Sequence, residues 1–345
     1  MNKSGILLVG NFLSSYTGTR SVGEELSLRL FAKGWKTIET SHQLRRTFRL
    51  LDILSSAIVY RKEYQIAYVE VYSGLAFFWA EMVMYLLLLL HKPVVLALHG
   101  GGLVEFAQTH PVRVSRLLRQ GQVIMTPSLF LQAGLKQYSS TIRYLPNAVD
   151  VSHYEFQLRH HPARKIIWLR AFHKIYEPEL AVKVISFLVK EFKDITLTMI
   201  GPDKKDGSLS SSLKLAEILD VASHIDIAGS IPKSKVPIWL TKGDIFLNTT
   251  CFESFGVSVV EAALVGLPIV TTNVGELSYL WENEKTALLV PPNDPEAMAV
   301  AVQRILTEPE LAEHLSQNAR NKAEQFDWSV ILPQWEALFE EVLNA

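Results

Sequence analysis

The sequence is nearly without cysteine, since Cys251 is the single one among 345 residues. A lone cysteine excludes an internal disulfide and is typical of proteins from a reducing compartment. The first residues, MNKSGILLVGNF, contain too short an apolar run for a secretory signal peptide. We therefore expect a cytoplasmic protein.

Several nucleotide- and metal-binding signatures are also absent. No G-x-G-x-x-G opens a helical stretch and no G-K-[S/T] occurs, so neither a standard dinucleotide pocket nor a P-loop is expected. The chain has no D-x-D and no tight histidine–cysteine cluster, which leaves a metal-dependent site without support. The run LHGGG at residues 98–102 is similar to the oxyanion loop of lipases, but those enzymes also need a G-x-S-x-G turn, which is missing.

What remains is the composition of a globular chain, with 48% hydrophobic and 20% charged residues. A chain of this length usually forms more than one hydrophobic core, so two domains are expected. The net charge of −1 is unevenly spread: residues 1–163 hold 17 Lys and Arg against 10 Asp and Glu, whereas residues 164–345 hold 17 against 25. Such asymmetry fits either a basic surface that meets membrane or nucleic acid, or independent drift of two domain surfaces.

Apolar strand-like runs alternate with helical stretches along the chain. We expect strands at residues 5–10, 65–71, 93–100, 122–128 and 142–150, and again at 165–172, 195–202, 225–231, 244–250, 268–275 and 287–293. Continuous apolar strands separated by helices predict parallel sheets covered on both faces. Because the pattern restarts near Arg164, we expect an α/β protein with two doubly wound domains, at residues 1–163 and 164–325. An amphipathic tail helix at 326–345 is expected to pack back on the protein.

One segment, SGLAFFWAEMVMYLLLLLH at residues 73–91, is apolar enough to span a bilayer on length alone. Glu81 lies near its middle, where a charge is costly in a membrane. The segment is also flanked by two of the expected strands. We interpret it as a buried crossover helix rather than as a membrane span.

The stretch ESFGVSVVE at residues 253–261 carries two carboxylates around a Phe-Gly pair. It follows an expected strand, so Glu253 should lie in the loop at the carboxyl end, with Ser254 as the N-cap of a helix that starts at Phe255 and Gly256. A helix N-terminus attracts phosphate, and the flanking carboxylates suit sugar and ribose hydroxyls. Spacing alone favours two solvated glutamates on an ordinary surface helix.

The same stretch resembles the E-x7-E signature of family 4 glycosyltransferases, a retaining group with the GT-B fold of two Rossmann-like domains that face each other across a cleft. The resemblance runs through nearly the whole chain in order. It includes TGTRSVGEEL, LALHGGG, TPS, LPNAVD and WLRAF before the signature, and GLPIVTTNVG and ALLVPPND after it.

The resemblance implies roles for individual residues. Glu253, His99 and Arg170 would form the catalytic group, in which Glu253 holds the donor sugar, His99 contacts it from the first domain and Arg170 grips the diphosphate. The residues implied in donor binding are Gly18, Arg170, Lys174, Ser254, Phe255, Gly256, Val257 and Glu261. Glu261 would bind the ribose. No metal and no other cofactor are implied beside the nucleotide-diphosphate sugar.

The chain departs from the family pattern at three places. The second phosphate-binding lysine is expected five residues after Arg170, where Ile175 stands, while Lys174 precedes it by one position. The usual Pro-Ser before the signature is replaced by two threonines. Glu276 stands where glycine is common and could crowd the sugar. Since Arg170 and both signature glutamates remain, we expect an active enzyme.

The implied reaction transfers a sugar, with retention, to an acceptor hydroxyl in polysaccharide, lipopolysaccharide or glycolipid synthesis. The acceptor, a glycan or a lipid-linked molecule, is expected on the first domain. There, residues 42–62 are basic and amphipathic, so an anionic membrane surface is a candidate partner; nucleic acid is not expected. The basic residues are Arg45, Arg46, Arg49, Arg61 and Lys62. Two alternatives stay open: a GT-B-shaped nucleotide-sugar epimerase and a non-catalytic sugar-nucleotide-binding partner subunit.

Overall fold

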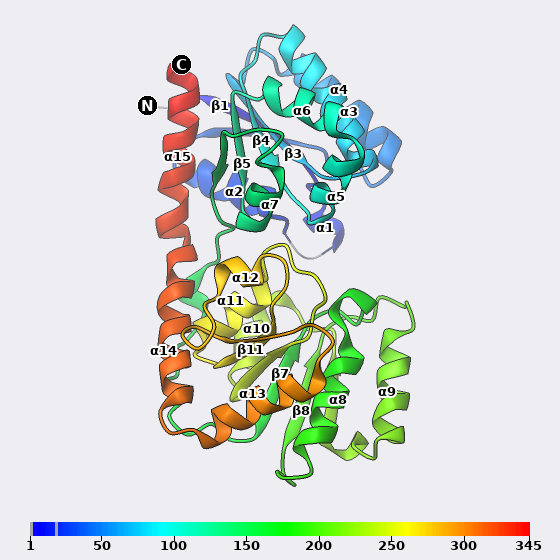
Figure 1. The fold of residues 1–345 in the computed structure, drawn as a ribbon. Helices are drawn as coiled ribbons and strands as arrows, with labels where there is room; N and C mark the ends of the chain where they lie inside the picture. Colours follow the sequence, from blue (N-terminus) through cyan, green and yellow to red (C-terminus); the bar gives the residue numbers. More distant parts are fainter. Residues whose placement is uncertain (1–2, 18–19) are drawn as a thin grey trace. The chain divides into compact units, whose positions relative to one another are not determined.

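The computed structural model describes residues 3–17 and 20–345, which divide into two compact units (Figure 1). Unit 1 consists of Met1–Ala148 together with Trp328–Ala345, and unit 2 is Val149–Asp327. From the sequence we expected the first domain to end at residue 163. In the structure, the segment 149–163 belongs to unit 2. Backbone hydrogen bonds attach this segment there, from Val149 N–H to the carbonyl of Phe326 at 2.8 Å.

Unit 1 contains a six-stranded parallel sheet in the order β2-β1-β3-β4-β5-β6. Its strands are β1 (Gly5–Val9), β2 (Lys36–Thr40), β3 (Ile66–Val71), β4 (Val94–Leu98), β5 (Val123–Thr126) and β6 (Ile142–Tyr144). The chain starts in the middle, at β1, moves outward to β2 and then crosses to β3. The strand order therefore reverses between β1 and β3, which is where open α/β sheets bind ligands.

Helices cover both faces of this sheet. They are α1 (Ser14–Thr17), α2 (Val22–Ala32), α3 (Arg46–Val59), α4 (Leu75–Leu89), α5 (Gly102–Thr109), α6 (Pro111–Gln120), α7 (Leu129–Leu135) and α15 (Trp328–Asn344). Successive residues of β1 point to opposite faces. Leu7 packs in the cluster under α3 to α7, whereas Leu8 packs in the cluster under α2 and α15. The last helix of the chain thus completes the core of unit 1.

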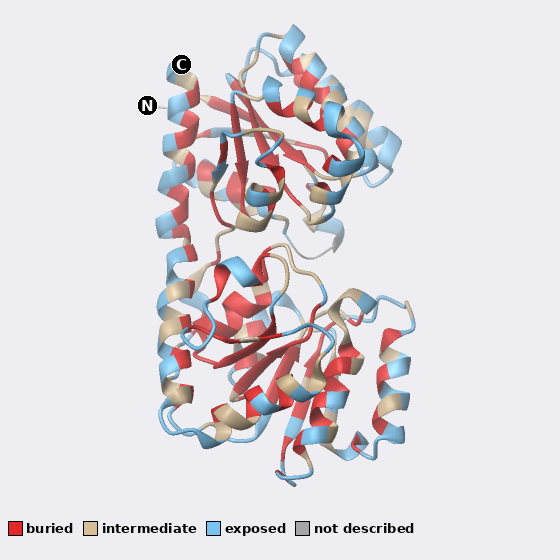
Figure 2. Ribbon diagram, in the orientation of Figure 1, coloured by how far each residue is buried: buried red, intermediate tan, exposed pale blue. Residues whose placement is uncertain are grey.

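The apolar segment that we interpreted as a buried crossover helix is α4. It connects β3 and β4 as a crossover helix, and one side of it contributes to the core while the other side is exposed. The burial colouring shows this contrast within the helices of unit 1 (Figure 2). Among the described residues, no helix has the length and apolar character needed to cross a bilayer.

Unit 2 repeats the architecture with the order β12-β11-β10-β7-β8-β9, again with parallel pairs throughout. Its strands are β7 (Lys165–Leu169), β8 (Thr196–Ile200), β9 (Ile225–Gly229), β10 (Ile245–Asn248), β11 (Ile269–Thr272) and β12 (Leu288–Val290). Its α-helices are α8 (Pro178–Leu188), α9 (Ser208–Ile218), α10 (Val236–Leu240), α11 (Val257–Leu264), α12 (Leu277–Leu280), α13 (Pro295–Thr307) and α14 (Leu311–Ala323). The order reverses between β7 and β10.

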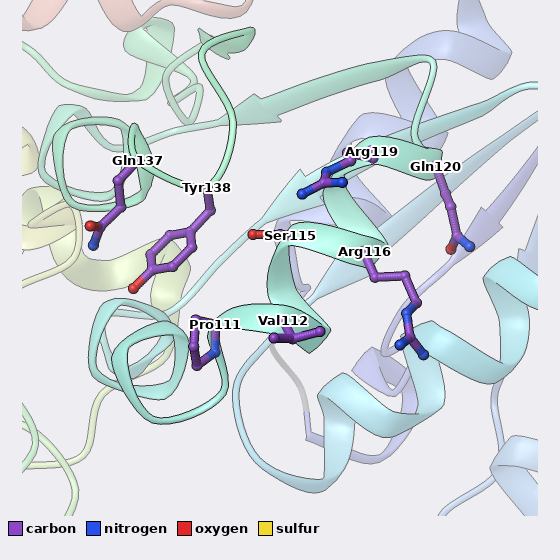
Figure 3. A pocket seen from close by; sticks show the side chains of 8 residues that line it. All are labelled: Pro111, Val112, Ser115, Arg116, Arg119, Gln120, Gln137 and Tyr138. Carbon is purple, nitrogen blue, oxygen red and sulfur yellow. The ribbon is translucent and has the colours of Figure 1, made fainter.

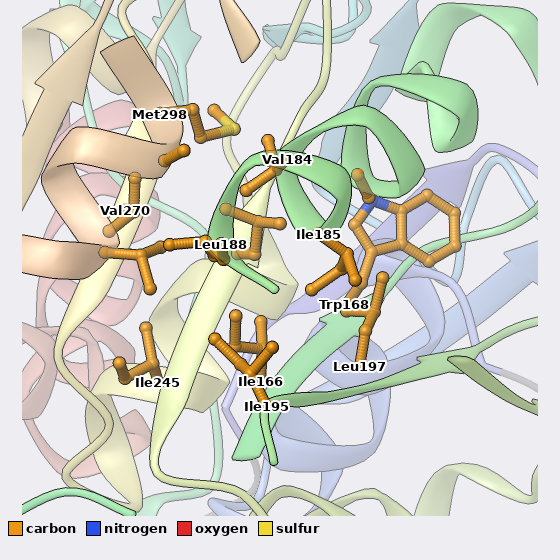
Figure 4. Packing of buried hydrophobic residues seen from close by; sticks show 14 of the residues in the cluster. Ile166, Trp168, Val184, Ile185, Leu188, Ile195, Leu197, Ile245, Val270 and Met298 are labelled. Atoms are coloured by element: carbon orange, nitrogen blue, oxygen red, sulfur yellow. The ribbon is translucent and has the colours of Figure 1, made fainter. Parts of the chain in front are cut away.

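The core of unit 2 lies on both faces of its sheet. On one face, Ile166 and Trp168 of β7 pack against Ile185 of α8 and near Met298 of α13 (Figure 4). On the other face, Ile167 belongs to the cluster that α10, α11 and α12 form. The predicted α/β class, with two doubly wound parallel sheets, is confirmed in each unit.

Candidate functional site

The candidate site of unit 2 is built where its strand order reverses. Arg170 directly follows β7, and Asn248 ends the neighbouring strand β10. The guanidinium Nε of Arg170 donates to the amide oxygen of Asn248 at 3.2 Å. Asn248 is fully buried and its own NH₂ donates to the hydroxyl of Thr271 at 2.9 Å. This chain of contacts fixes a cation at the carboxyl edge of the sheet.

Glu253 lies beside this cation. Its Oε2 accepts a hydrogen bond from Nη2 of Arg170, and its Oε1 accepts from the backbone N–H groups of Ser254 at 3.0 Å and Phe255 at 3.3 Å. The guanidinium also lies 5.2 Å from the centre of the Tyr176 ring. Both charged side chains are about nine-tenths buried, with 11% and 12% exposure. Two of the three predicted catalytic residues are therefore in direct contact.

A glycine keeps the loop of Glu253 in place. Gly275 has a φ of +52°, and a Cβ there would lie 2.2 Å from the carbonyl oxygen of Glu253. The same carbonyl accepts the N–H of Glu276 at 2.9 Å. The side chain of Glu276 is fully buried.

The helix after the loop begins later than its sequence suggested. We predicted a start at Phe255 and Gly256 with Ser254 as N-cap, but α11 begins at Val257 and its N-cap is Gly256, with a φ of +90°. The left-handed backbone, which glycine tolerates best, overrides the capping tendency of serine. Phe255 is a core residue, packed edge-on against Phe326.

The first turn of α11 begins with two N–H groups, those of Val257 and Ser258, that precede its first internal hydrogen bond, from Val259 N–H to the carbonyl of Gly256 at 2.9 Å. N–H groups at this position have no carbonyl partner earlier in the helix, which makes a helix N-terminus attractive to anions. The hydroxyl of Ser258 is buried and has no hydrogen-bond partner among the described residues. Sequence reasoning did not select Ser258, although its place in the first turn was a usable signal.

Glu261 is the second signature carboxylate and is 2% exposed. Its Oε1 accepts a hydrogen bond from the hydroxyl of Tyr154 at 2.5 Å and another from the ammonium of Lys233, which follows β9. Burial, followed by the charge of Glu261, raises the pKa of Tyr154, so this phenol stays a donor. Neither Tyr154 nor Lys233 was predicted, because both lie far from Glu261 in the sequence.

Lys174 is exposed and is not joined to this cluster by any contact among the described residues. Its backbone N–H donates to a carboxylate oxygen of Asp206 at 2.8 Å. Hydrogen bonds from Ser208 and from this N–H lower the pKa of Asp206 to about 2. Ile175 uses its carbonyl to accept the N–H of Cys251 at 2.9 Å, which ties this turn to the loop after β10.

His99, the third predicted catalytic residue, belongs to unit 1 and follows β4. It is 8% exposed, stacks on Tyr72 with ring centres 5.4 Å apart, and has Nε2 3.4 Å from the hydroxyl of Tyr68. Burial lowers its pKa to about 4, so the imidazole is neutral at physiological pH. Gly18, the remaining predicted donor contact, lies outside the described residues.

Unit 1 holds one further charged group at the point where its own strand order reverses. Glu70 near the end of β3 is 8% exposed and accepts a hydrogen bond from Tyr72 at 3.2 Å. A small cavity of about 60 Å³ beside it is also lined by Gly10 and Asn11, which follow β1. Burial raises the pKa of Glu70 to about 7. No motif in the sequence pointed to Glu70.

Within the part of the chain that the structure describes, no group of three or more His, Cys, Asp or Glu side chains is arranged to hold a metal ion. The charged groups of the unit 2 site are instead compensated by one another, Arg170 by Glu253 and Lys233 by Glu261.

Comparisons with known proteins show which family and which folds the chain is similar to. Residues 153–322, most of unit 2, match the family described as "Glycosyl transferases group 1". The D-inositol 3-phosphate glycosyltransferase of Paenarthrobacter aurescens is 28% identical over 167 residues, which cover 47% of this chain and 40% of that protein. Glycogen synthase of Mycobacterium tuberculosis is 24% identical over 231 residues, 65% of this chain and 55% of that protein. The chain thus spans about half the length of these relatives.

Solved structures extend the likeness of fold to the whole chain. The sucrose-phosphate synthase of Thermosynechococcus elongatus has a TM-score of 0.79 at 17% identity and covers 99% of this chain and 100% of that one. The Anabaena protein Alr3699/HepE, solved with UDP and glucose, has a TM-score of 0.75 at 15% identity. The match covers 98% of this chain and 100% of that one. In sequence over residues 153–322 and in fold over nearly its full length, the chain is therefore similar to glycosyltransferases of group 1 and their structural neighbours.

Proposed function

We propose that this chain is a retaining, nucleotide-sugar-dependent glycosyltransferase that acts on an acceptor hydroxyl. One observation carries the proposal: two buried carboxylates, each beside its own cation, flank the N-terminus of α11 at the ligand-binding edge of unit 2. An anion needs donors and positive charge, whereas the hydroxyls of a sugar and a ribose need acceptors, and this site offers both.

Each part of the nucleotide-sugar donor would then be bound by different residues. The diphosphate would occupy the start of α11, held by free N–H groups, by the hydroxyl of Ser258 and by Arg170. Arg170 keeps part of its guanidinium available, since its hydrogen bonds to Asn248 and Glu253 use Nε and Nη2. Glu261, oriented by Tyr154 and Lys233, would accept from the ribose diol, and Glu253 from the donor sugar.

The chemistry is the same for any acceptor alcohol. The bond between the anomeric carbon and the diphosphate oxygen breaks, and a bond from the acceptor oxygen forms on the same face. The acceptor proton passes to the departing phosphate. Preorganised donors stabilise the charge that develops on the diphosphate, and losing one such contact costs about 3 kcal/mol of activation free energy. In this scheme no metal is required.

Two further roles rest on the family resemblance. His99 would contact the donor sugar, for which a neutral imidazole with one donor and one acceptor nitrogen is suited. Gly18 would allow a close approach to the phosphates. The acceptor class is a glycan or lipid-linked molecule of polysaccharide, lipopolysaccharide or glycolipid synthesis. The relative named glycogen synthase supports a glycan acceptor, and the Anabaena structure with UDP and glucose supports a nucleotide sugar as donor.

The first experiment is a thermal-shift panel with UDP, GDP, ADP and their sugar conjugates, with and without Mg²⁺. A ligand at a hundred times its dissociation constant stabilises the protein by about 2.7 kcal/mol. We expect a shift from one nucleotide without Mg²⁺, and its loss in Arg170→Ala. Arg164→Ala is the matched control, because Arg164 precedes the same strand and pairs with the exposed Asp194. No shift with any nucleotide would contradict the donor site.

A second experiment separates transfer from the two alternatives. An epimerase would convert the selected nucleotide sugar without any acceptor, which NMR of the sugar detects. A binding subunit would leave Glu253→Gln indistinguishable from wild type in an assay for transfer. We expect slow donor hydrolysis without acceptor, transfer with retained anomeric configuration when an acceptor is present, and loss of transfer in Glu253→Gln.

A further inference from the structure

The outward side of α4 is an uncovered apolar stripe. Leu75, Phe78, Met82, Tyr85 and Leu89 recur at intervals of three and four residues, the spacing of one helix face. Their exposed fractions are 72%, 47%, 37%, 67% and 58%. A soluble surface seldom leaves a contiguous row of large apolar side chains in water. We therefore expect this stripe to be covered by a binding partner.

Basic residues stand on both sides of this stripe. α3 and α6 are the helices packed beside α4 in unit 1. On α3, the exposed Phe48 and Leu51 widen the apolar surface, and Arg46 adds charge. The sequences of α3, α4 and α6 together contain five arginines and two acidic residues. One of these arginines, Arg49, donates to Asn11 and to backbone carbonyls rather than standing free. One of the two acids, Glu81, is neutralised by Arg113, whose Nε donates to it at 3.1 Å.

A hollow beside α6 is lined by two arginines, Arg116 and Arg119, whose side chains have no ion-pair partner among the described residues. The hollow has a volume of about 580 Å³. Figure 3 shows Ser115, Arg116 and Arg119 of α6 on one side of it and Gln137 with Tyr138 on the other. Neither Arg116 nor Arg119 forms an ion pair or hydrogen bond within residues 3–17 and 20–345. Exposed arginines beside hydroxyl groups suit a phosphate.

Two partners could cover this surface: a second copy of the chain or a lipid membrane. A second copy of the chain placed on this face would set arginines opposite arginines, which like charges disfavour. An anionic lipid leaflet offers acyl chains to the stripe and phosphates to the arginines at the same time. We propose that the outward faces of α3, α4 and α6 dock unit 1 onto an anionic membrane surface, with α4 lying in the plane of the leaflet.

The dimensions fit an in-plane helix. The 15 residues of α4 have a length of about 22 Å, which is short of the bilayer core, and its other side is part of the protein interior. The basic face at residues 42–62 was visible in the sequence; the apolar centre of the surface was not. Docking needs neither donor nor acceptor, so it stands apart from the proposed transfer.

The test is co-sedimentation of the full chain with vesicles of phosphatidylcholine alone, or of phosphatidylcholine and phosphatidylglycerol in equal parts. We expect binding to the anionic vesicles alone, weakened by salt. Phe78→Ser/Tyr85→Ser should bind at least about tenfold more weakly, because two partly exposed aromatic rings no longer enter the lipid. Arg116→Gln/Arg119→Gln should bind roughly 25-fold more weakly, since each charge near such a surface contributes about fivefold.

The control is Leu213→Ser/Ile218→Ser on α9 of unit 2. Its two residues are 46% and 68% exposed, which matches Phe78 and Tyr85, and it should bind like wild type. A spin label at Tyr85→Cys in a Cys251→Ser chain gives a second measurement. The label should become accessible to oxygen dissolved in the bilayer, whereas one at Ile218→Cys should not.

Three results would overturn the proposal. The first is absence of wild-type binding to anionic vesicles. The second is equal binding by wild type and both test variants. The third is a dimer in sedimentation equilibrium that Phe78→Ser/Tyr85→Ser dissociates, without vesicle binding, which would assign the face to a second copy.

Discussion

Replacing Glu70 by glutamine should change how the stability of the protein depends on pH. In the folded chain this buried carboxyl has a pKa of about 7, above the usual 4.5. The folded state therefore keeps the proton up to about pH 7, whereas the unfolded chain releases it near pH 4.5. Between these values the unfolded state binds fewer protons, so rising pH favours unfolding. The stability linked to this proton is present below pH 4.5 and is lost as the pH rises through 7.

The size of the effect follows from the two pKa values. A difference of about 2.5 units corresponds to roughly 3 kcal/mol, at 1.36 kcal/mol for each unit. Glu70→Gln has no proton to release, so its stability relative to wild type should improve by up to about 3 kcal/mol between acid pH and pH 8. Any fixed cost of the amide is the same at each pH and cancels in this comparison.

The assay is urea denaturation of both proteins across this pH range. Contributions from unit 2 cancel in the difference, because the substitution lies in unit 1. The reasoning is refuted if the difference in unfolding free energy between the two proteins stays constant within about 0.5 kcal/mol from pH 4.5 to pH 8. Glu70 would then be ionised in the folded chain, and the burial of its carboxyl would not govern its charge.

Three other substitutions test the unit 2 site, and a fourth, Gly207→Ala, is the control for Gly275→Ala. Tyr154→Phe removes a hydrogen bond to the buried Glu261 and should lower the unfolding free energy by about 1.5–3 kcal/mol, measured in urea. Ser258→Ala should leave stability within about 0.5 kcal/mol of wild type but weaken the nucleotide-induced thermal shift, because the lost hydroxyl has no partner in the protein. Gly275→Ala should cost about 2 kcal/mol or more and abolish nucleotide binding, since its Cβ would meet a backbone carbonyl at 2.2 Å. Gly207→Ala, with a φ of +93° and open space, should cost about 1 kcal/mol and keep binding.

The strands were largely predictable, because most of them are buried on both faces and read as continuous apolar runs. Their order within each sheet was not predicted, since it depends on tertiary packing. The exception is β2, Lys36–Thr40, which was not predicted. It is an edge strand with a polar, half-buried sequence, so its periodicity is weak. The apolar composition of α4 likewise did not reveal which of its sides faces water, since its row of apolar residues continues around the helix.

At the site, the sequence placed Glu253 in the loop after a strand and Glu261 in the second turn of the following helix, and the structure has both there. It placed Arg170 near the end of the expected strand at 165–172, and in the structure Arg170 directly follows β7. The sequence could not predict the contacts of Glu261 with Tyr154, 107 residues away, or with Lys233. Such contacts arise from tertiary packing alone. The sequence also suggested a capping role for Ser254 where the left-handed conformation of Gly256 decides the start of α11.

The place of α15 in the fold has a consequence for how the protein is made. Its side chains, among them Trp335 and Phe339, complete the core beneath β1 and β3, yet all of unit 2 is translated before them. All strands of unit 2 are synthesised before α15, so unit 2 can fold on the ribosome before unit 1 is complete. Until α15 is synthesised, one face of the unit 1 sheet lacks the helix that covers it. During that interval unit 1 is the part of the nascent chain most open to aggregation and to chaperones. A gene rearranged to encode α15 ahead of β1 would remove the delay.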